Sequence, residues 1–273
     1  MQDATFVRVI TRRADLRFPF PDRFAARLEG QTVTSLERRG KHLLARLSSG
    51  DVLLMHLGMS GSFRVDGPDE PAAVEFHYDC SSEARHDHVV FRMSSGVTIT
   101  YNDPRRFGSM DLVPGDRLSG HAPLSGLGPE PLGDDFDAAA LARACAGKSM
   151  SLKAALSDQR VVAGLGNIYV CEALHHARLS PRRRASTIAT RTGAPRPVAR
   201  HLAAAIRHVL NQAVKRSVRW QETGARGDAS YLPNRFRVYD RQGARCLRPR
   251  CAGRIRRIGQ SGRSTFYCPV CQK

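Results

Sequence analysis

Two cysteine pairs near the C-terminus constrain the fold of this chain more than any other feature. The pairs are Cys246-x4-Cys251 and Cys268-x2-Cys271, with sixteen residues between them. Two close pairs on two turns supply four sulfur ligands for a tetrahedral zinc ion. The segment is too short to fold around an apolar core, and a structural zinc stabilises such a module by roughly 10–16 kcal/mol. The sequence therefore predicts one structural zinc ion held by these four cysteines.

Four free thiols, or two disulfides, are the alternatives for these cysteines. The other three of the seven cysteines, Cys80, Cys145 and Cys171, are scattered along the chain. An odd count, together with an N-terminus that lacks an apolar signal core, argues against a disulfide framework. No stretch is apolar enough over sufficient length to span a membrane. We therefore expect a soluble intracellular protein without a membrane partner, in which zinc is favoured over disulfides.

The charge of the chain indicates a polyanionic partner. Lys and Arg number 43 against 25 acidic residues, which gives a formal net charge of +18. From Arg241 to Lys273 there are eight Arg, one Lys and no acid, so about +7 remains on the small C-terminal module after zinc and four thiolates are counted. No basic amphipathic helix with a bulky apolar face stands out, so nucleic acid is favoured over a membrane surface. The alternative is an arginine-rich protein without such a partner.

A β-hairpin is predicted between the cysteine pairs. Apolar and polar residues alternate in "RIRRI" and in "STFYC", and "GQSGR" supplies the turn. This places Arg263 beside the tip of the hairpin. Arg263 either points toward nucleic acid or is an ordinary solvated arginine, and the spacing does not separate the two.

The N-terminal part of the chain reads mostly as strands. Residues 5–110 contain two apolar hairpins, "KHLLARLSSGDVLLMHL" and "HVVFRMSSGVTITYND", each built around a Ser-Ser-Gly turn. They predict a β-sandwich or a barrel-like half. Residues 114–135 hold four Pro and five Gly, which is typical of a linker.

Helices are predicted after the linker. "DDFDAAALARACAG" and "SMSLKAALSDQ" are the first two, the second with Ser149 or Ser151 as its cap. "NIYVCEALHHARLSP" follows the Gly-rich turn "VVAGLGN" and places Asn167 at the N-cap. Unpaired amides at such a helix start favour an anion, so this turn is a candidate phosphate grip. A longer helix follows, with an apolar face of Val198, Leu202, Ile206, Val209 and Ala213.

Four motifs, "HLGMSG", "DPRRFG", "GLGNIYVCEAL" and "GRSTFYCPVCQK", occur in order along the chain. On these motifs the sequence, from about Ala4 to its last residue, resembles the formamidopyrimidine-DNA glycosylases, bacterial base-excision enzymes. The resemblance implies an α+β multidomain protein with DNA in a cleft between its domains. The expected parts are an N-terminal β-sandwich (1–113), a linker (114–135), a helix–two-turns–helix domain (136–222), a loop (223–236) and a zinc finger (237–273).

The activity implied by the resemblance is release of oxidised purines, such as 8-oxoguanine and formamidopyrimidines, from double-stranded DNA. The enzyme then cuts the DNA strand at the abasic site by β,δ-elimination. The resemblance also implies a monomer in the bacterial cytoplasm. A damaged base must leave the helical stack, and side chains must fill the vacancy. In the family a Met, an Arg and a Phe do so, and they match Met59, Arg105 and Phe107. Without the resemblance, two core side chains and a turn salt bridge would be the ordinary interpretation.

Other residues acquire roles by the same match. Lys41 in "RRGKHLL" is implied in the lyase step, where it donates a proton or grips a phosphate near the lesion. Arg263 matches the finger-tip arginine that assists δ-elimination. His86, Lys148 and Asn167 match positions that hold the DNA backbone, and the four cysteines match the zinc ligands. The segment "GARGDASYLPN" corresponds loosely to a loop that covers the extruded base.

The catalytic N-terminus of the family has no counterpart in this sequence. The family's nucleophile is an N-terminal proline that is followed by a glutamate, whereas Gln2 and Asp3 stand here. "QDATFVRVI" matches the family's first strand, so the preceding helix is absent. Two explanations compete: a start codon assigned too late in a longer protein that begins Pro-Glu, or a truncated protein that binds DNA without cleaving it. The first is favoured because the other motifs are intact.

Three alternative functions remain at this point. An endonuclease VIII-like enzyme would prefer oxidised pyrimidines, although the Arg-Arg-Phe run in "DPRRFG" favours purines. A non-catalytic protein that binds damaged DNA would show salt-dependent binding without strand cutting. A zinc-ribbon protein that binds RNA would not need the wedge motifs.

Covalent trapping tests the interpretation of the N-terminus. We expect the 273-residue chain to form no borohydride-trapped adduct with abasic-site DNA, because the attacking secondary amine is missing. A protein extended upstream to a Pro-Glu start should form the adduct. Trapping by the shorter chain at the efficiency of the extended one would show that this interpretation is wrong.

Overall fold

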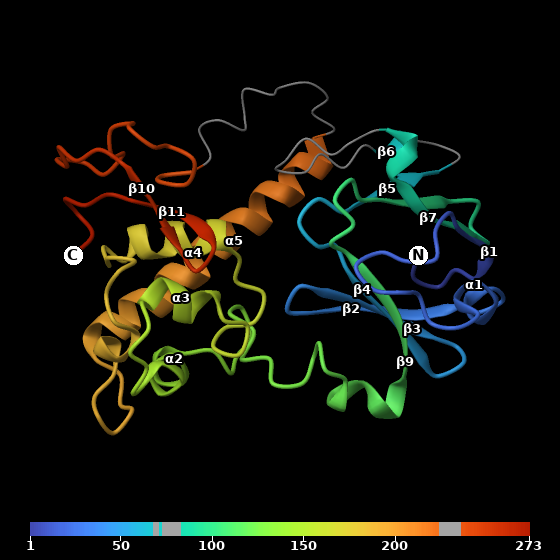
Figure 1. The fold of residues 1–273 in the computed structure, drawn as a ribbon, viewed down its shortest axis with the longest axis horizontal. Helices are drawn as coiled ribbons and strands as arrows, with labels where there is room; N and C mark the ends of the chain where they lie inside the picture. The colour runs from blue at the N-terminus through green and yellow to red at the C-terminus, as the bar shows by residue number, and fades with distance from the viewer. Residues whose placement is uncertain (68–70, 73–82, 224–235) are drawn as a thin grey trace. The chain divides into compact units, whose positions relative to one another are not determined.

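A computed structural model of the chain describes residues 1–67, 71–72, 83–223 and 236–273 (Figure 1). The chain divides into two compact units, Met1–Ser125 and Gly126–Lys273. The segment "GARGDASYLPN" and Cys80 lie outside the described residues. Within the described part, no helix combines the length and the apolar character needed to cross a membrane.

The first unit is built from short strands. Its elements are β1 (Phe6–Thr11), α1 (Phe24–Leu28), β2 (Val33–Arg39), β3 (His42–Leu47), β4 (Asp51–His56), β5 (Ser62–Asp66), β6 (Pro71–Ala72), η1 (Ala84–His86), β7 (Asp87–Met93), β8 (Thr98–Asn102), β9 (Ser109–Pro114) and η2 (Gly115–Gly120).

Two antiparallel sheets form a β-sandwich in this unit, as predicted. One sheet has the strand order β1-β7-β8-β5-β6 and the other β2-β3-β4-β9. The core between them draws side chains from both sheets, such as Phe6 and Phe91 from the first and Leu53 and Met110 from the second. The predicted hairpins are β3–β4 and β7–β8, which turn at the two Ser-Ser-Gly sequences. Alternation of apolar and polar residues thus brings the apolar faces of both sheets together.

The second unit is helical and ends in a hairpin. Its elements are α2 (Ala138–Cys145), α3 (Leu152–Ser157), α4 (Asn167–His176), η3 (Ala185–Ile188), α5 (Pro197–Thr223), β10 (Arg256–Gln260) and β11 (Arg263–Tyr267). A single apolar core joins the helices, with Leu141, Leu152, Leu174, Leu202 and Ile206 among its members.

The cap of α3 agrees with the sequence, whereas the cap of α4 does not. The Ser151 hydroxyl accepts a hydrogen bond from the Ala154 amide at 3.2 Å, so Ser151 is the cap of α3. The N-cap of α4 is Gly166, and the prediction that Asn167 caps this helix is wrong by one residue. Asn167 is instead the first helical residue, and its side-chain amide donates to the Ser264 carbonyl at 2.9 Å.

The C-terminal hairpin forms between the cysteine pairs, as predicted, but its turn is tighter than "GQSGR". Gln260 pairs with Arg263, so only Ser261 and Gly262 make the turn. Both residues have positive φ, 50° and 70°, the conformation that tight hairpin turns require. In Figure 1, β11 lies against α4.

Candidate nucleic-acid interface

The first group of predicted residues lies on two adjacent loops of the sandwich. Met59 follows β4, and Arg105 and Phe107 precede β9. Met59 is 54% exposed and Phe107 42% exposed, so neither side chain packs in the core of the sandwich. The Arg105 guanidinium stacks 4.7 Å from the centre of the Phe107 ring. The two loops touch, because a Cβ on Gly58 would lie 2.4 Å from the Phe107 carbonyl carbon.

A buried carboxylate fixes both loops. Asp103 has no exposed surface. One of its oxygens accepts from the Ser60 hydroxyl at 2.6 Å and from the Arg105 amide at 3.3 Å. The other accepts from the Gly108 amide at 2.9 Å and from the Tyr101 hydroxyl at 3.1 Å. A single side chain thus ties the loop of Met59 to the loop of Arg105 and Phe107.

Tyr101 fills the space behind the carboxylate. Burial, together with the adjacent Asp103, raises the pKa of the Tyr101 phenol, so the hydroxyl stays protonated and donates. A Cβ on Gly61 or Gly108 would lie 2.3 or 1.8 Å from this hydroxyl oxygen. The glycines of "HLGMSG" and "DPRRFG" are therefore required by close packing.

The end of β4 is held by a neutral imidazole. Burial, aided by the charges of His42, Lys41 and Arg17, lowers the pKa of His56 to about 4. At neutral pH the ring is therefore uncharged, and its Nδ1 carries no proton because it accepts a hydrogen bond from the Gly58 amide at 3.0 Å. This bond fixes the backbone directly before Met59.

Lys41 and His86 occupy different positions around these loops. Lys41 is exposed in the turn between β2 and β3. The carbonyl of His86 accepts from the Asp103 amide at 3.0 Å, so the backbone of His86 lies beside the loop anchor. His88, two residues further along in β7, is buried, and its Nε2 lies 2.9 Å from the Asp103 carbonyl oxygen. The structure thus brings His86, Met59, Arg105 and Phe107 to the same end of the sandwich.

In the second unit, Asn167 and Arg263 come together. Arg263 is exposed at the start of β11, next to Ser264, whose carbonyl receives the Asn167 amide. The start of α4 and the hairpin tip are therefore one continuous surface. Lys148 lies after the end of α2, where its carbonyl accepts from the Ser186 amide at 3.1 Å, and the described contacts do not join it to this surface.

Lys153 is a buried residue next to the hairpin tip that the sequence did not single out. Its side chain is buried, and its Nζ lies 3.4 Å from the Gln260 carbonyl at the hairpin tip. Burial lowers the pKa of Lys153, the Cys171 thiol opposes this effect, and the Arg263 guanidinium adds to it. In the sequence, Leu152, Ala155 and Leu156 form the apolar stripe of α3 and Lys153 lies beside it, so the pattern predicts a solvated lysine and carries no signal of its burial.

The four C-terminal cysteines fit a zinc ion. Their Sγ atoms all lie within 4.8 Å of one another. The Sγ atoms of Cys246 and Cys271 are 3.8 Å apart and those of Cys251 and Cys268 are 3.7 Å apart. Zn–S bonds of about 2.3 Å in a tetrahedron place sulfurs about 3.8 Å apart. No other group of three or more metal-ligating residues is this close in the part of the chain that the structure describes.

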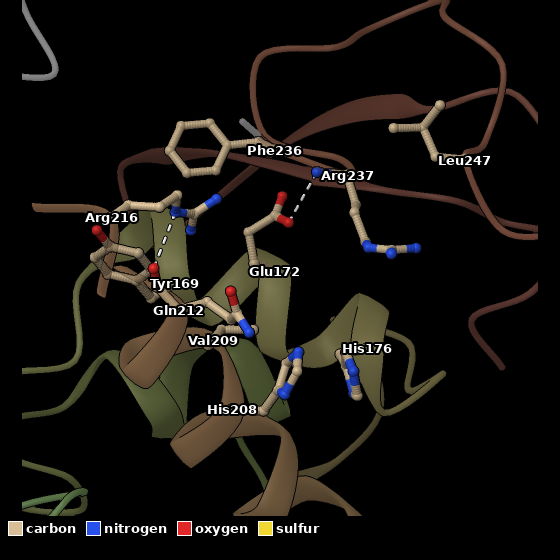
Figure 2. A pocket seen from close by; sticks show the side chains of 10 residues that line it. All are labelled: Tyr169, Glu172, His176, His208, Val209, Gln212, Arg216, Phe236, Arg237 and Leu247. Atoms are coloured by element: carbon tan, nitrogen blue, oxygen red, sulfur yellow. Dashed lines mark hydrogen bonds between the residues drawn. The ribbon is translucent and has the colours of Figure 1, made fainter. Parts of the chain in front are cut away.

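A cavity of about 440 Å³ lies beside the finger, lined by residues of α4, α5 and the start of the finger (Figure 2). The carboxylate of Glu172 points to the finger backbone there and accepts from the amides of Arg237, Val238 and Tyr239 at 2.9–3.0 Å. None of the predicted site residues lines this cavity, and Glu172 in its wall joins the finger backbone to α4.

Family comparisons cover nearly the whole chain. A model described as the formamidopyrimidine-DNA glycosylase N-terminal domain matches residues 1–110. The H2TH domain of the same enzymes matches residues 127–222, and a zinc finger found in FPG and IleRS matches residues 249–273.

Individual proteins agree with these matches. The formamidopyrimidine-DNA glycosylase of Bradyrhizobium diazoefficiens is 58% identical over 277 residues, which span 100% of this chain and 94% of that protein. The Nitrobacter winogradskyi protein of the same name is also 58% identical, with the same coverage. A crystal structure of the Lactococcus lactis enzyme bound to DNA with an AP site superposes with a TM-score of 0.80 at 26% identity, covering 100% of this chain and 94% of that one. A structure of MutM with DNA that contains carbocyclic 8-oxo-G has a TM-score of 0.78 at 27% identity, again with 100% and 94% coverage.

Replacing Asp103 tests the loop anchor. Asp103→Asn substitutes an NH₂ group for one accepting oxygen, which leaves a buried donor unpaired at a cost of about 1–3 kcal/mol. We expect urea unfolding at a lower midpoint and faster hydrogen exchange at the Gly108 amide. Asp66→Asn is the control, because Asp66 is in an exposed ion pair and its loss should change stability by less than about 0.5 kcal/mol. Equal effects from both variants would contradict the anchor.

A pair of glycines tests the zinc site. A Cβ on Gly253 would lie 2.4 Å from the Cys268 Sγ, whereas a Cβ on Gly259 would meet nothing within 4 Å. We expect the wild-type protein and Gly259→Ala to carry one zinc per chain by elemental analysis, and Gly253→Ala to carry clearly less. Full zinc content in Gly253→Ala, or no zinc in the wild type, would overturn the assignment.

Proposed function

The chain belongs to the formamidopyrimidine-DNA glycosylase family, whose members are DNA glycosylases with AP lyase activity, and from this premise we propose how its own residues serve that function. The substrate is double-stranded DNA with an oxidised purine or an abasic site. The protein functions in base-excision repair as a monomer, in the bacterial cytoplasm and in association with the nucleoid. The carrying observation is the rigid pair of loops that presents Met59, Arg105 and Phe107 to solvent.

Met59 and Phe107 occupy the vacancy left by an extruded nucleotide. An exposed apolar side chain on a rigid loop gains burial when it enters the stack, and Asp103 fixes both loops before DNA arrives. Arg105 offers N–H donors to the base that is left unpaired on the opposite strand. Stacking on Phe107 orients the Arg105 guanidinium before DNA binds.

Charged and polar residues bind the DNA backbone. Lys41 holds a phosphate near the lesion or donates a proton in the lyase step. His86, Lys148 and Asn167 contact phosphates, and Arg263 at the hairpin tip assists the second elimination. The zinc ion holds the hairpin that presents Arg263 and has no part in bond breaking.

Binding assays with matched variants test this function. We expect the protein to bind a duplex with a tetrahydrofuran abasic analogue more tightly than the intact duplex. Phe107→Ala should weaken binding to the abasic duplex by about 5- to 150-fold, because base–aromatic stacking contributes about 1–3 kcal/mol. Leu36→Ala is the control, since Leu36 is equally exposed, at 42%, on β2. Its affinity should stay within about twofold of the wild type.

Two further measurements sharpen this test. Replacing a phosphate-binding residue, as in Lys148→Ala, should reduce the slope of log K against log salt by about 0.9 per lost contact. A duplex with 8-oxoguanine should compete better than one with an oxidised pyrimidine. Equal affinity for intact, abasic and lesion-containing duplexes would refute the proposal.

A further inference from the structure

His175 is a buried histidine in direct contact with a zinc ligand. It is the next-to-last residue of α4, has no exposed surface, and its Nε2 lies 3.4 Å from the Cys246 Sγ. Its other ring nitrogen, Nδ1, is buried and has no hydrogen-bond partner among the described residues. The thiol contact is therefore the polar interaction that accounts for this imidazole in the core.

The surroundings of the two ring nitrogens show which atom donates in this hydrogen bond. A zinc-bound thiolate has no proton and can only accept, so Nε2 must carry the hydrogen. A proton on Nδ1 instead would be a buried N–H without an acceptor, which costs about 1–3 kcal/mol. Both observations favour the Nε2–H form, with Nε2 donating to the sulfur.

This donor matters because of the charge at the site. Four thiolates around Zn²⁺ carry a net charge of −2, and Cys246 and Cys268 are buried. A hydrogen bond to a thiolate offsets part of that charge and fixes the orientation of the ligand, which is how residues around a metal site tune its affinity.

The same helix contacts the finger at both of its ends. At its start, Asn167 donates to the Ser264 carbonyl beside Arg263. At its end, about 12 Å away at 1.5 Å per residue, His175 meets Cys246. Arg248, two residues after that cysteine, donates to the His175 carbonyl at 2.6 Å. The zinc site and the hairpin tip are thus fixed to one rigid rod.

We propose that His175 is a positioning residue that donates its Nε2–H to the zinc-bound thiolate of Cys246 and so couples zinc binding to the placement of Arg263. The zinc part stands on the geometry of the finger alone. The part that concerns Arg263 at DNA rests on the function proposed above.

His175→Phe removes the donor and keeps an aromatic ring in the core. We expect zinc affinity, measured by competition with a chelator, to fall by about 10- to 100-fold. In the cobalt-substituted protein, the sulfur-to-metal charge-transfer band should shift. His176→Phe is the matched control. His176 is the adjacent residue, the centre of its ring lies 4.5 Å from that of His208, and its side chain lines the cavity of Figure 2. This variant should leave both readouts unchanged.

A second variant separates loss of the hydrogen bond from loss of folding. His175→Gln retains an N–H donor at a similar reach and should recover much of the zinc affinity. Zinc affinity and a cobalt spectrum equal to the wild type in His175→Phe would overturn the proposal, as would a His175→Gln variant no better than His175→Phe.

DNA binding distinguishes this inference from the proposed function. At limiting zinc, His175→Phe should bind the abasic duplex more weakly than the wild type, and excess zinc should restore binding. Weaker zinc affinity in a protein that does not select damaged DNA would refute the proposed function and leave the zinc role of His175 standing. Weaker zinc affinity with unchanged binding to damaged DNA at limiting zinc would refute the coupling.

Discussion

The carboxylate of Asp103 is the interaction on which the two loops that carry Met59, Arg105 and Phe107 depend. Burying a carboxylate is unfavourable unless its oxygens are hydrogen-bonded, and here both are. Because the donors come from two loops and one strand, those loops cannot move independently without exposing an unpaired charge. The exposed Met59 and Phe107 are therefore carried on a rigid support, which on the function proposed above reduces the entropy lost on binding DNA.

The finger depends on its surroundings in a comparable way. Its own buried cluster is small, and Cys171 of α4 completes it. Glu172 accepts three backbone amides where the described finger begins, and the Gln272 amide donates to the Leu179 carbonyl at its end. Zinc closes the finger internally, whereas side chains of the helical domain fix its orientation. Each unit thus contains a buried carboxylate, Asp103 or Glu172, that accepts several hydrogen bonds and so holds a loop or the start of the finger in place.

The sequence predicted the features that depend on local pattern. Strand alternation indicated the sandwich, cysteine spacing indicated the zinc site, and the hairpin followed from alternation between the pairs. Contacts between distant segments could not be predicted in this way. Asn167 reads as a cap because Asn favours that position, yet its side chain bonds Ser264, 97 residues later in the chain. Lys153 and Asp103 were missed for the same reason, since their partners become neighbours only in the folded protein.

Three departures from ordinary folding rules, at Met59, Asp103 and Phe107, fall in the motifs "HLGMSG" and "DPRRFG", and a fourth, at Lys153, lies outside the four motifs. Met59 and Phe107 are exposed although their chemistry favours burial, and Lys153 and Asp103 are buried although theirs favours solvent. On the function proposed above, the fold keeps Met59 and Phe107 exposed for binding, and the hydrogen bonds of Asp103 hold the loops that carry them. The same reasoning applies to His175, a polar side chain whose place in the core is explained by the sulfur it contacts.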